Sequence, residues 1–172
     1  MLIKISVENF KSFDKKEELS MVSSSKIQTN KSHRLKIKQT MLLKNAVVYG
    51  ANASGKSNLV TAVAFIKNVL MEGLPVSSVN DFCRNTPKNK ERESVFEIQF
   101  TVGDSFYAYG FSAILSQRKI TEEWLFELMQ DGSAHNLFMR EGNKAPALGE
   151  KVNPTTAEKK KQLKETGMLL MQ

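Results

Sequence analysis

Apolar and polar residues along this chain follow three different patterns. Residues 2–9 alternate between the two types, and a period of two predicts a strand. A second strand is expected at residues 17–22. Residues 46–49 form a short continuous apolar run, which is typical of a buried parallel strand. Apolar residues then recur at helical spacing, and this predicts a helix over residues 56–71 that Gly73 ends.

One broad side of this helix carries the apolar residues that should face a core. They are Leu59, Ala62, Val63, Ile66, Val69 and Leu70. Two polar segments flank the strand, loop and helix region. Residues 23–39 are basic and rich in Ser and Asn, which predicts an exposed loop, and residues 76–92 are expected to be a second polar connection.

The period returns to two from residue 94 onward. Gly103 and Asp104 separate two alternating runs, and a two-residue break of this type indicates a tight hairpin. Further strands are expected at residues 106–115, 120–128 and 136–140. The second half of the chain is therefore predicted to be an antiparallel meander of about four strands.

Residues 47–58, VVYGANASGKSN, contain the phosphate-loop pattern G-x-x-x-x-G-K-[ST] at Gly50, Gly55, Lys56 and Ser57. Glycines let the backbone curl so that successive N–H groups point at phosphate oxygens. The lysine can then reach the outer phosphates, and the serine hydroxyl can bind Mg²⁺. A helix that begins near Gly55 would add its positive N-terminal dipole.

The predicted binding residues for a nucleotide form one continuous segment. They are Gly50, Ala51, Asn52, Ala53, Ser54, Gly55, Lys56, Ser57 and Asn58, with Ser57 as the Mg²⁺ ligand. A chance match to the pattern is the alternative. Because a strand and a helix are expected on either side of the loop, a functional site is favoured over coincidence.

Composition narrows the class of protein. The chain has 172 residues, of which 41% are hydrophobic and 25% charged, as in an ordinary globular domain. No apolar run is long enough to cross a membrane, so no membrane partner is expected. Cys83 is the only cysteine, which is consistent with the reducing cytoplasm. His33 and His135 are isolated, and no spacing suggests a metal site.

The net charge of +7 is unevenly distributed, because no acidic residue occurs between Glu18 and Glu72. That interval contains Lys26, Lys31, Arg34, Lys36, Lys38, Lys44, Lys56 and Lys67. Such a stretch can attract a polyphosphate ligand, contact the backbone of DNA or RNA, or simply be a solvated loop. The sequence leaves these three interpretations open.

Aromatic and acidic residues of the meander allow further hypotheses. Tyr107, Tyr109 and Trp124 could stack on bases, but sheet core and cross-strand pairing are the commoner roles and are favoured. Glu122 and Glu123 are expected to be surface residues of a strand.

The order MLIKISVENFKSF, a second strand and NAVVYGANASGKSNLVTAV resembles the N-terminal lobe of ABC-type ATPases of the SMC and OLD kind. It is similar in particular to bacterial AAA-family ATP-binding proteins of phage defence and abortive infection. The segments EIQF, YAYGF, EEWLFEL and LFMREGNK resemble the antiparallel subdomain of these proteins.

The resemblance implies an α/β P-loop NTPase fold with α+β character, in which nucleotide drives association of two ATPase heads as a homodimer. It implies that Lys56 contacts the β- and γ-phosphates of ATP and that Ser57 binds Mg²⁺. It further implies that Lys11 and Ser12, in the NFKSF turn, lie beside the nucleotide.

The chain departs from the family because no apolar strand runs into an Asp-Glu pair and no Ser-Gly signature loop occurs. Residues 1–172 are therefore expected to be a single incomplete ATPase domain that lacks a C-terminal lobe. Its expected parts are a nucleotide-binding core (1–75), an antiparallel subdomain (94–142) and the start of a helical segment (155–172). Such a chain is expected to bind ATP without hydrolysing it. The alternative is a nucleic-acid-binding module with a vestigial phosphate loop.

Overall fold

A computed structural model describes residues 1–24, 26, 29–52 and 54–149. Within these residues the chain is mixed α/β, with one large sheet in which every strand pairing is antiparallel. The strand order is β2-β1-β5-β6-β7-β8-β9. The bounds are β1 (Leu2–Glu8), β2 (Glu17–Ser20), β5 (Ser94–Val102), β6 (Ser105–Ile114), β7 (Lys119–Leu128), β8 (Ala134–Glu141) and β9 (Ala147–Leu148).

The predicted meander is confirmed, and it is continuous with the N-terminal strands. Val102 pairs with Ser105, so the expected two-residue turn at Gly103 and Asp104 joins β5 to β6. β1 pairs with β5 as well as with β2, so residues 2–20 belong to the same sheet as the meander. The helical segment expected at 155–172 lies outside the described residues.

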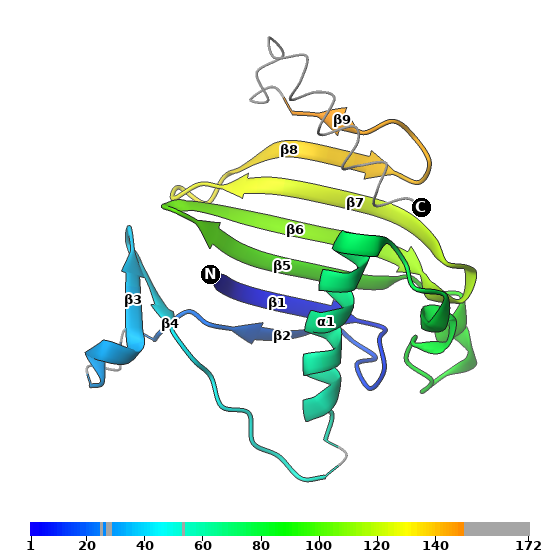
Figure 1. Ribbon diagram of the computed structural model, residues 1–172, viewed down its shortest axis with the longest axis horizontal. Helices are drawn as coiled ribbons and strands as arrows, with labels where there is room; N and C mark the ends of the chain where they lie inside the picture. Colours follow the sequence, from blue (N-terminus) through cyan, green and yellow to red (C-terminus); the bar gives the residue numbers. More distant parts are fainter. Residues whose placement is uncertain (25, 27–28, 53, 150–172) are drawn as a thin grey trace.

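Helix α1 (Lys56–Glu72) lies across one face of the sheet, as Figure 1 shows. It begins and ends as predicted, and Gly73 takes a positive φ of 79° after its last turn. The side facing the sheet carries the buried residues Ala62, Phe65, Ile66 and Val69. The predicted face is thus corrected at one edge: Phe65 belongs to it, whereas Val63 is 45% exposed.

An aromatic cluster joins the helix to the sheet. The Phe65 ring lies 5.0 Å from that of Phe10 and 5.0 Å from that of Phe96, measured between centroids. Phe96 on β5 stacks on Phe111 of β6 at 5.0 Å. Phe10, Phe96 and Phe111 are fully buried. Aromatic rings at these separations attract one another in addition to the free energy gained by burying them. Phe10, which precedes Lys11, is therefore fixed in the core.

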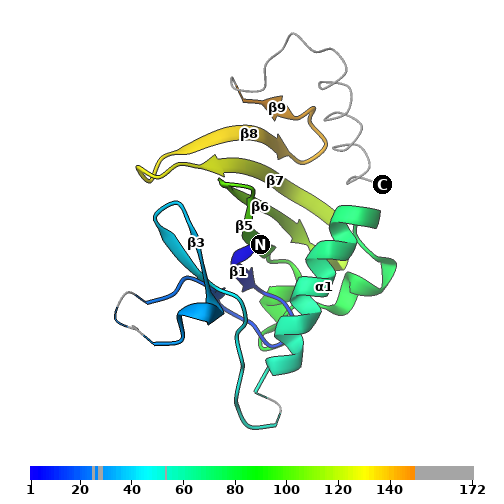
Figure 2. The same ribbon diagram turned by 60° about the vertical axis from the view of Figure 1, so that its left-hand side comes forward.

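Two short strands correct the loop prediction for residues 23–39. β3 (Arg34–Ile37) and β4 (Thr40–Leu43) form a separate hairpin, which follows the 3₁₀ helix η1 (Lys31–His33). Figure 2 shows this hairpin beside the main sheet. The polar and basic composition had suggested an exposed loop. Instead, Ile37 pairs with Thr40 across a two-residue turn. The side chains of Ile37 and Leu42 are buried. Two apolar side chains are enough to set the register of so short a hairpin.

The prediction of a buried parallel strand at residues 46–49 is wrong for this structure. The segment is irregular, and Val47, Val48 and Tyr49 are 67%, 46% and 88% exposed. A parallel strand needs neighbours that satisfy its backbone donors and acceptors, and no described strand pairs with this one. Apolar composition alone therefore did not produce burial.

The connection from α1 to β5 contains two 3₁₀ helices, η2 (Val76–Asn80) and η3 (Pro87–Lys90), and a third, η4 (Leu115–Gln117), follows β6. Of the helices in the described part of the chain, α1 is the longest at 17 residues. None of them has the length and apolar composition needed to cross a membrane.

The sheet-core role predicted for the tyrosines and the tryptophan is confirmed. Tyr109 is buried, Tyr107 stacks on its cross-strand partner Phe100, and Trp124 covers Gly110, where a Cβ would lie 2.4 Å from the indole. Close approach of this kind is possible only at glycine.

Glu123, by contrast, was wrongly predicted as a surface residue. It is fully buried, and it accepts hydrogen bonds from the Tyr109 hydroxyl at 2.7 Å and from the Arg140 guanidinium. Glu122 is exposed as expected. Burial raises the pKa of Glu123, while Tyr109 and Arg140 act in the opposite direction. Because side chains alternate along a strand, one of two adjacent glutamates points inward. Tyr109 and Arg140, which supply hydrogen bonds to the buried carboxylate, lie fourteen and seventeen residues away in the sequence.

Candidate functional site

The phosphate loop ends at the first turn of α1, and Gly55 is the residue that turns the chain into the helix. Its φ is 91°, a conformation that residues other than glycine seldom adopt. A Cβ on Gly55 would also lie 2.8 Å from Oγ of Ser12. Asn58 N donates to the Gly55 carbonyl at 2.9 Å, so the helical hydrogen bonds start here. Both the backbone conformation and the neighbouring turn therefore require this glycine.

Lys56 folds back over its own loop. Its Nζ donates to the carbonyl oxygens of Gly50 and Ala51, each at 2.6 Å, and lies 3.4 Å from Oγ of Ser54. The ammonium is thus surrounded by oxygen atoms, the same kind of partner that phosphate oxygens provide. The lysine is placed where a bound anion could replace the carbonyls.

Ser57 and Asn58 occupy the next two positions of α1. Ser57 is exposed, and its side chain forms no hydrogen bond to a described residue, so its hydroxyl is accessible to a ligand. The Asn58 amide donates to Oγ of Ser12 at 2.8 Å. This bond spans forty-six residues of sequence and joins the NFKSF turn to the phosphate loop.

A cleft of about 370 Å³ lies over the loop. Its lining consists of Asn52, Ser54, Gly55, Lys56, Ser57 and Asn58. Its volume falls within the usual range for small-molecule sites, ~300–1,000 Å³. Among the described lining residues Lys56 carries the only charge, and it is positive. Ala53, the remaining residue of the predicted set, lies outside the described residues.

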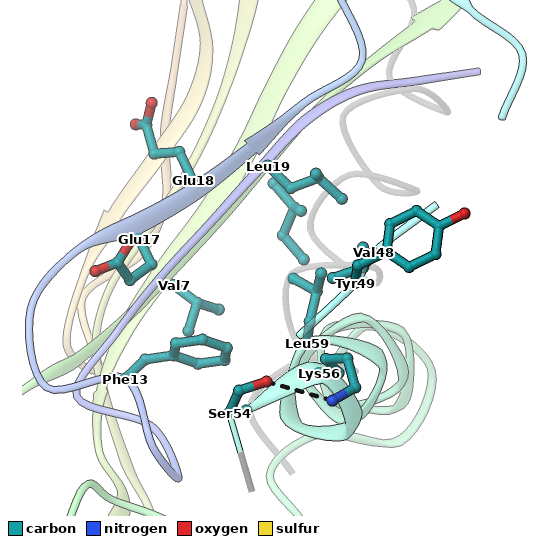
Figure 3. A pocket seen from close by; sticks show the side chains of 12 residues that line it. Val7, Phe13, Glu17, Glu18, Leu19, Val48, Tyr49, Ser54, Lys56 and Leu59 are labelled. Atoms are coloured by element: carbon teal, nitrogen blue, oxygen red, sulfur yellow. Dashed lines mark hydrogen bonds between the residues drawn. The ribbon is translucent and has the colours of Figure 1, made fainter. Parts of the chain in front are cut away.

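Two further hollows adjoin this cleft. One, of about 590 Å³, is lined by Ser12, Phe13, Asp14, Lys15, Glu17 and Ser54. The other, of about 210 Å³, is more apolar, and Figure 3 shows Val7, Phe13 and Leu19 facing Leu59 and Lys56 across it. The NFKSF turn therefore forms a wall of both hollows.

Asn9 holds this turn in place from behind. Its side chain is fully buried, and Nδ2 donates to the carbonyl oxygens of Asn89 and Arg92, each at 2.9 Å. Its Oδ1 accepts from Cys83 N at 3.2 Å, and its carbonyl accepts from the Ser94 hydroxyl at 2.6 Å. Asn9 also has a φ of 49°, in the left-handed region that asparagine tolerates better than most residues.

The turn itself is closed by reciprocal backbone hydrogen bonds between Phe10 and Phe13, at 2.9 and 2.8 Å. Sequence reasoning missed Asn9 as a positioning residue, although it is the first letter of the NFKSF stretch. The partners of its side chain are backbone groups of residues 83–93, and no local pattern indicates which backbone groups an asparagine will reach.

The two turn residues that the resemblance placed beside the nucleotide have different positions. The structure brings Ser12 against Gly55 and Asn58, at the phosphate loop. Lys11 instead forms an ion pair with Asp81, in which Nζ lies 2.6 Å from Oδ1. Lys11 N also donates to the Asp81 carbonyl at 2.7 Å. The site as it stands thus includes Ser12, whereas Lys11 ties the turn to the residues after η2.

The polar groups of the phosphate loop match those that a nucleotide with Mg²⁺ requires. The phosphate loop offers a lysine ammonium, an exposed serine hydroxyl and a helix N-terminus, which together fit a polyphosphate with its cation. Within the described residues no three His, Cys, Asp or Glu side chains gather as metal ligands. The Ser57 hydroxyl is the side-chain oxygen of the loop that could bind a magnesium ion here.

Comparison with known families decides the class of protein. The family model described as "AAA domain, putative AbiEii toxin, Type IV TA system" matches residues 46–141, which is more than half of the chain. The chain belongs to this AAA-domain family. No curated protein matches it. The match begins at the segment before the phosphate loop, includes α1 and ends with β8, whereas β1, β2 and the NFKSF turn precede it.

Membership in the AAA-domain family identifies a P-loop NTPase and agrees with the mixed α/β structure. The prediction of a nucleotide-binding phosphate loop is therefore confirmed at the level of the family. Family membership does not identify the individual contact residues, which remain predictions supported by the geometry described above.

Proposed function

We propose that this chain binds ATP together with Mg²⁺ at residues 50–58. The observation that carries the proposal is the position of the Lys56 ammonium, 2.6 Å from two carbonyl oxygens of its own loop at the edge of the cleft. A lysine held by backbone carbonyls can exchange them for phosphate oxygens without a change in the helix that carries it.

The chain's own residues would divide the work in a simple way. Lys56 would neutralise charge on the outer phosphates, and the Ser57 hydroxyl would be a Mg²⁺ ligand. Backbone N–H groups at residues 52–57 would contact the inner phosphates, helped by the N-terminal dipole of α1. Ser12 and Asn58, already hydrogen-bonded, would fix the distance between the turn and the phosphates.

We further propose that the chain is the N-terminal lobe of an SMC/OLD-like ATPase whose two heads associate as a homodimer around nucleotide. The NFKSF turn packed against the phosphate loop supports this proposal. The family's description names a toxin of a toxin–antitoxin system, which is compatible with a role in phage defence or abortive infection. A cytoplasmic location and the absence of hydrolysis by this chain alone stay predictions.

The test compares Lys56→Ala with Lys67→Ala by titration of a fluorescent ATP analogue in the presence of Mg²⁺. Lys67 is a matched control, because it is an exposed lysine on the same helix, three turns from the loop. We expect Lys56→Ala to weaken binding by roughly 100-fold, equivalent to about 2.7 kcal/mol, and Lys67→Ala to leave it unchanged. Equal affinity of the Lys56→Ala variant and the unchanged protein would refute the proposed site.

A further inference from the structure

The hairpin that the sequence did not predict contains several cationic residues and no acidic one. We call residues 31–44, comprising η1, β3 and β4, the basic hairpin. Paired residues of an antiparallel ladder point to the same face. Arg34 and Lys36, opposite Leu43 and Met41, therefore share its outer face. Lys31, Lys36, Lys38 and Lys44 are all exposed.

The other face of the basic hairpin is anchored to the body of the protein. Ile37 and Leu42 are buried with Ile3 of β1, and Phe106 of β6 packs against them. Ser23 N donates to the Met41 carbonyl at 2.8 Å, and Leu43 N donates to the Met21 carbonyl at 2.7 Å. The cations are thus presented on a fixed two-stranded support and not on a freely solvated loop.

These lysines have no acidic partner among the described residues, a property that they share with other exposed lysines such as Lys67, Lys88 and Lys90. Lys4, Lys11 and Lys144 each form an ion pair, as do Arg92 and Arg140. Lys31, Lys36, Lys38 and Lys44 form none with any described residue. Like charges held together without counter-charges repel one another, and a polyanion is the ligand that relieves the repulsion.

We propose that the basic hairpin binds duplex DNA through its phosphate backbone. Lysine and arginine side chains that replace condensed counterions supply most of the sequence-independent affinity for DNA. The major groove of B-DNA is wide enough to admit a two-stranded ribbon, whereas that of an RNA duplex is deep and narrow. The only apolar side chain of β3 with substantial exposure is Leu35, which is too little for insertion into a lipid surface.

The same charges could instead steer ATP toward the phosphate loop, but the arrangement does not favour this. Figures 1 and 2 both separate the basic hairpin from the start of α1, with the 44–55 connection running between them. The hairpin is therefore a site of its own, and the proposal is independent of nucleotide binding.

The experiment measures anisotropy of a short fluorescent DNA duplex titrated with the full chain over a series of salt concentrations. The test variant is Lys31→Glu/Lys36→Glu. The matched control is Lys88→Glu/Lys90→Glu, which reverses two exposed lysines of η3 and changes the net charge equally. A second test variant, Lys31→Gln/Lys36→Gln, removes the same charges without introducing new ones. Circular dichroism confirms that each variant is folded.

We expect the test variant to bind at least roughly tenfold more weakly at low salt, with a slope of log K against log salt smaller by about 2. The control should retain the affinity of the unchanged protein. Equal losses in the test variant and the control would show a general charge effect and overturn the proposal, as would unchanged affinity. Preference for an RNA duplex, or binding to anionic vesicles but not to DNA, would overturn it as well.

Discussion

The NFKSF turn at residues 9–14 and the phosphate loop at residues 50–55 meet at the start of α1, but they are stabilised in different ways. Asn9 and Phe10 are fully buried, and the turn is held by contacts with α1, β5 and the residues before β5. The segment leading into the loop is exposed, with Tyr49 88% accessible. The hydrogen bonds of the loop are local, and the shortest are those that Lys56 donates to the Gly50 and Ala51 carbonyls.

The difference indicates which half of the site is preformed. Buried polar groups cost about 1–3 kcal/mol each when their partners are lost, so the turn has little freedom to rearrange. Exposed hydrogen bonds can be exchanged for bonds to water or to a ligand at little cost. We infer that the turn fixes the position of Ser12, while the loop and Lys56 adapt to the bound anion.

The largest expected effect comes from removing the side chain that holds the turn. Asn9→Ala deletes the amide that bonds Asn89, Arg92 and Cys83 and places alanine at a positive φ. We expect the free energy of unfolding in urea to fall by about 3–4 kcal/mol. The matched control is Asn45→Ala in the exposed segment, which should change it by less than about 0.5 kcal/mol. Similar values for the two variants would remove the contrast between the regions.

The same contrast explains which features could be predicted from sequence. Strands β5 to β8 and α1 follow from periodicity, because each buries one face and the alternation records which residues those are. The 46–49 segment has the composition of a buried strand, but it is exposed and no described strand pairs with it. Composition does not encode whether a pairing strand is present. Ile37 and Leu42, which anchor the basic hairpin, are only two apolar residues in a polar stretch.

The candidate site was predictable in its chemistry but not in its support. The spacing of Gly50, Gly55, Lys56 and Ser57 identified the phosphate loop, since backbone N–H groups and a lysine are what phosphates require. That Lys11 pairs with Asp81 depends on residues seventy apart in the chain. Long-range polar contacts of this kind depend on tertiary packing, and the spacing of residues in the sequence does not predict them.

A second buried polar group extends the comparison to β7, where Glu123 pairs with Phe111 and so lies on the same face of the sheet as α1. Because burial raises the pKa of Glu123, the folded protein holds this proton more tightly than the unfolded chain, where the ordinary value is 4.5. The stability that Glu123 contributes is therefore fully present below about pH 4.5 and is lost as the pH rises through the raised pKa.

We expect the unfolding free energy of the unchanged protein, relative to Glu123→Gln, to fall with rising pH inside this window. The slope cannot exceed about 1.4 kcal/mol per pH unit for one proton. Urea unfolding of both proteins across a pH series measures it. Glu122→Gln is the matched control, since its side chain is exposed and its removal should leave the pH dependence unchanged. A difference that rises with pH would mean that Tyr109 and Arg140 outweigh burial.

The smallest expected effect tests the hydrogen bond between Ser12 of the turn and Asn58, which follows the loop in the first turn of α1. Ser12→Ala removes the acceptor of the Asn58 amide while leaving Gly55 unobstructed. Because the bond is exposed, the unfolding free energy should fall by only about 0.5 kcal/mol. If the turn positions the loop, affinity for a fluorescent ATP analogue should nevertheless fall roughly threefold, which is equivalent to about 0.6 kcal/mol. A double-mutant cycle with Asn58→Ala separates the pair from each residue's other contacts. A coupling energy near zero in binding, with both single variants weaker, would mean that Ser12 and Asn58 act on the nucleotide independently and that the turn does not position the loop.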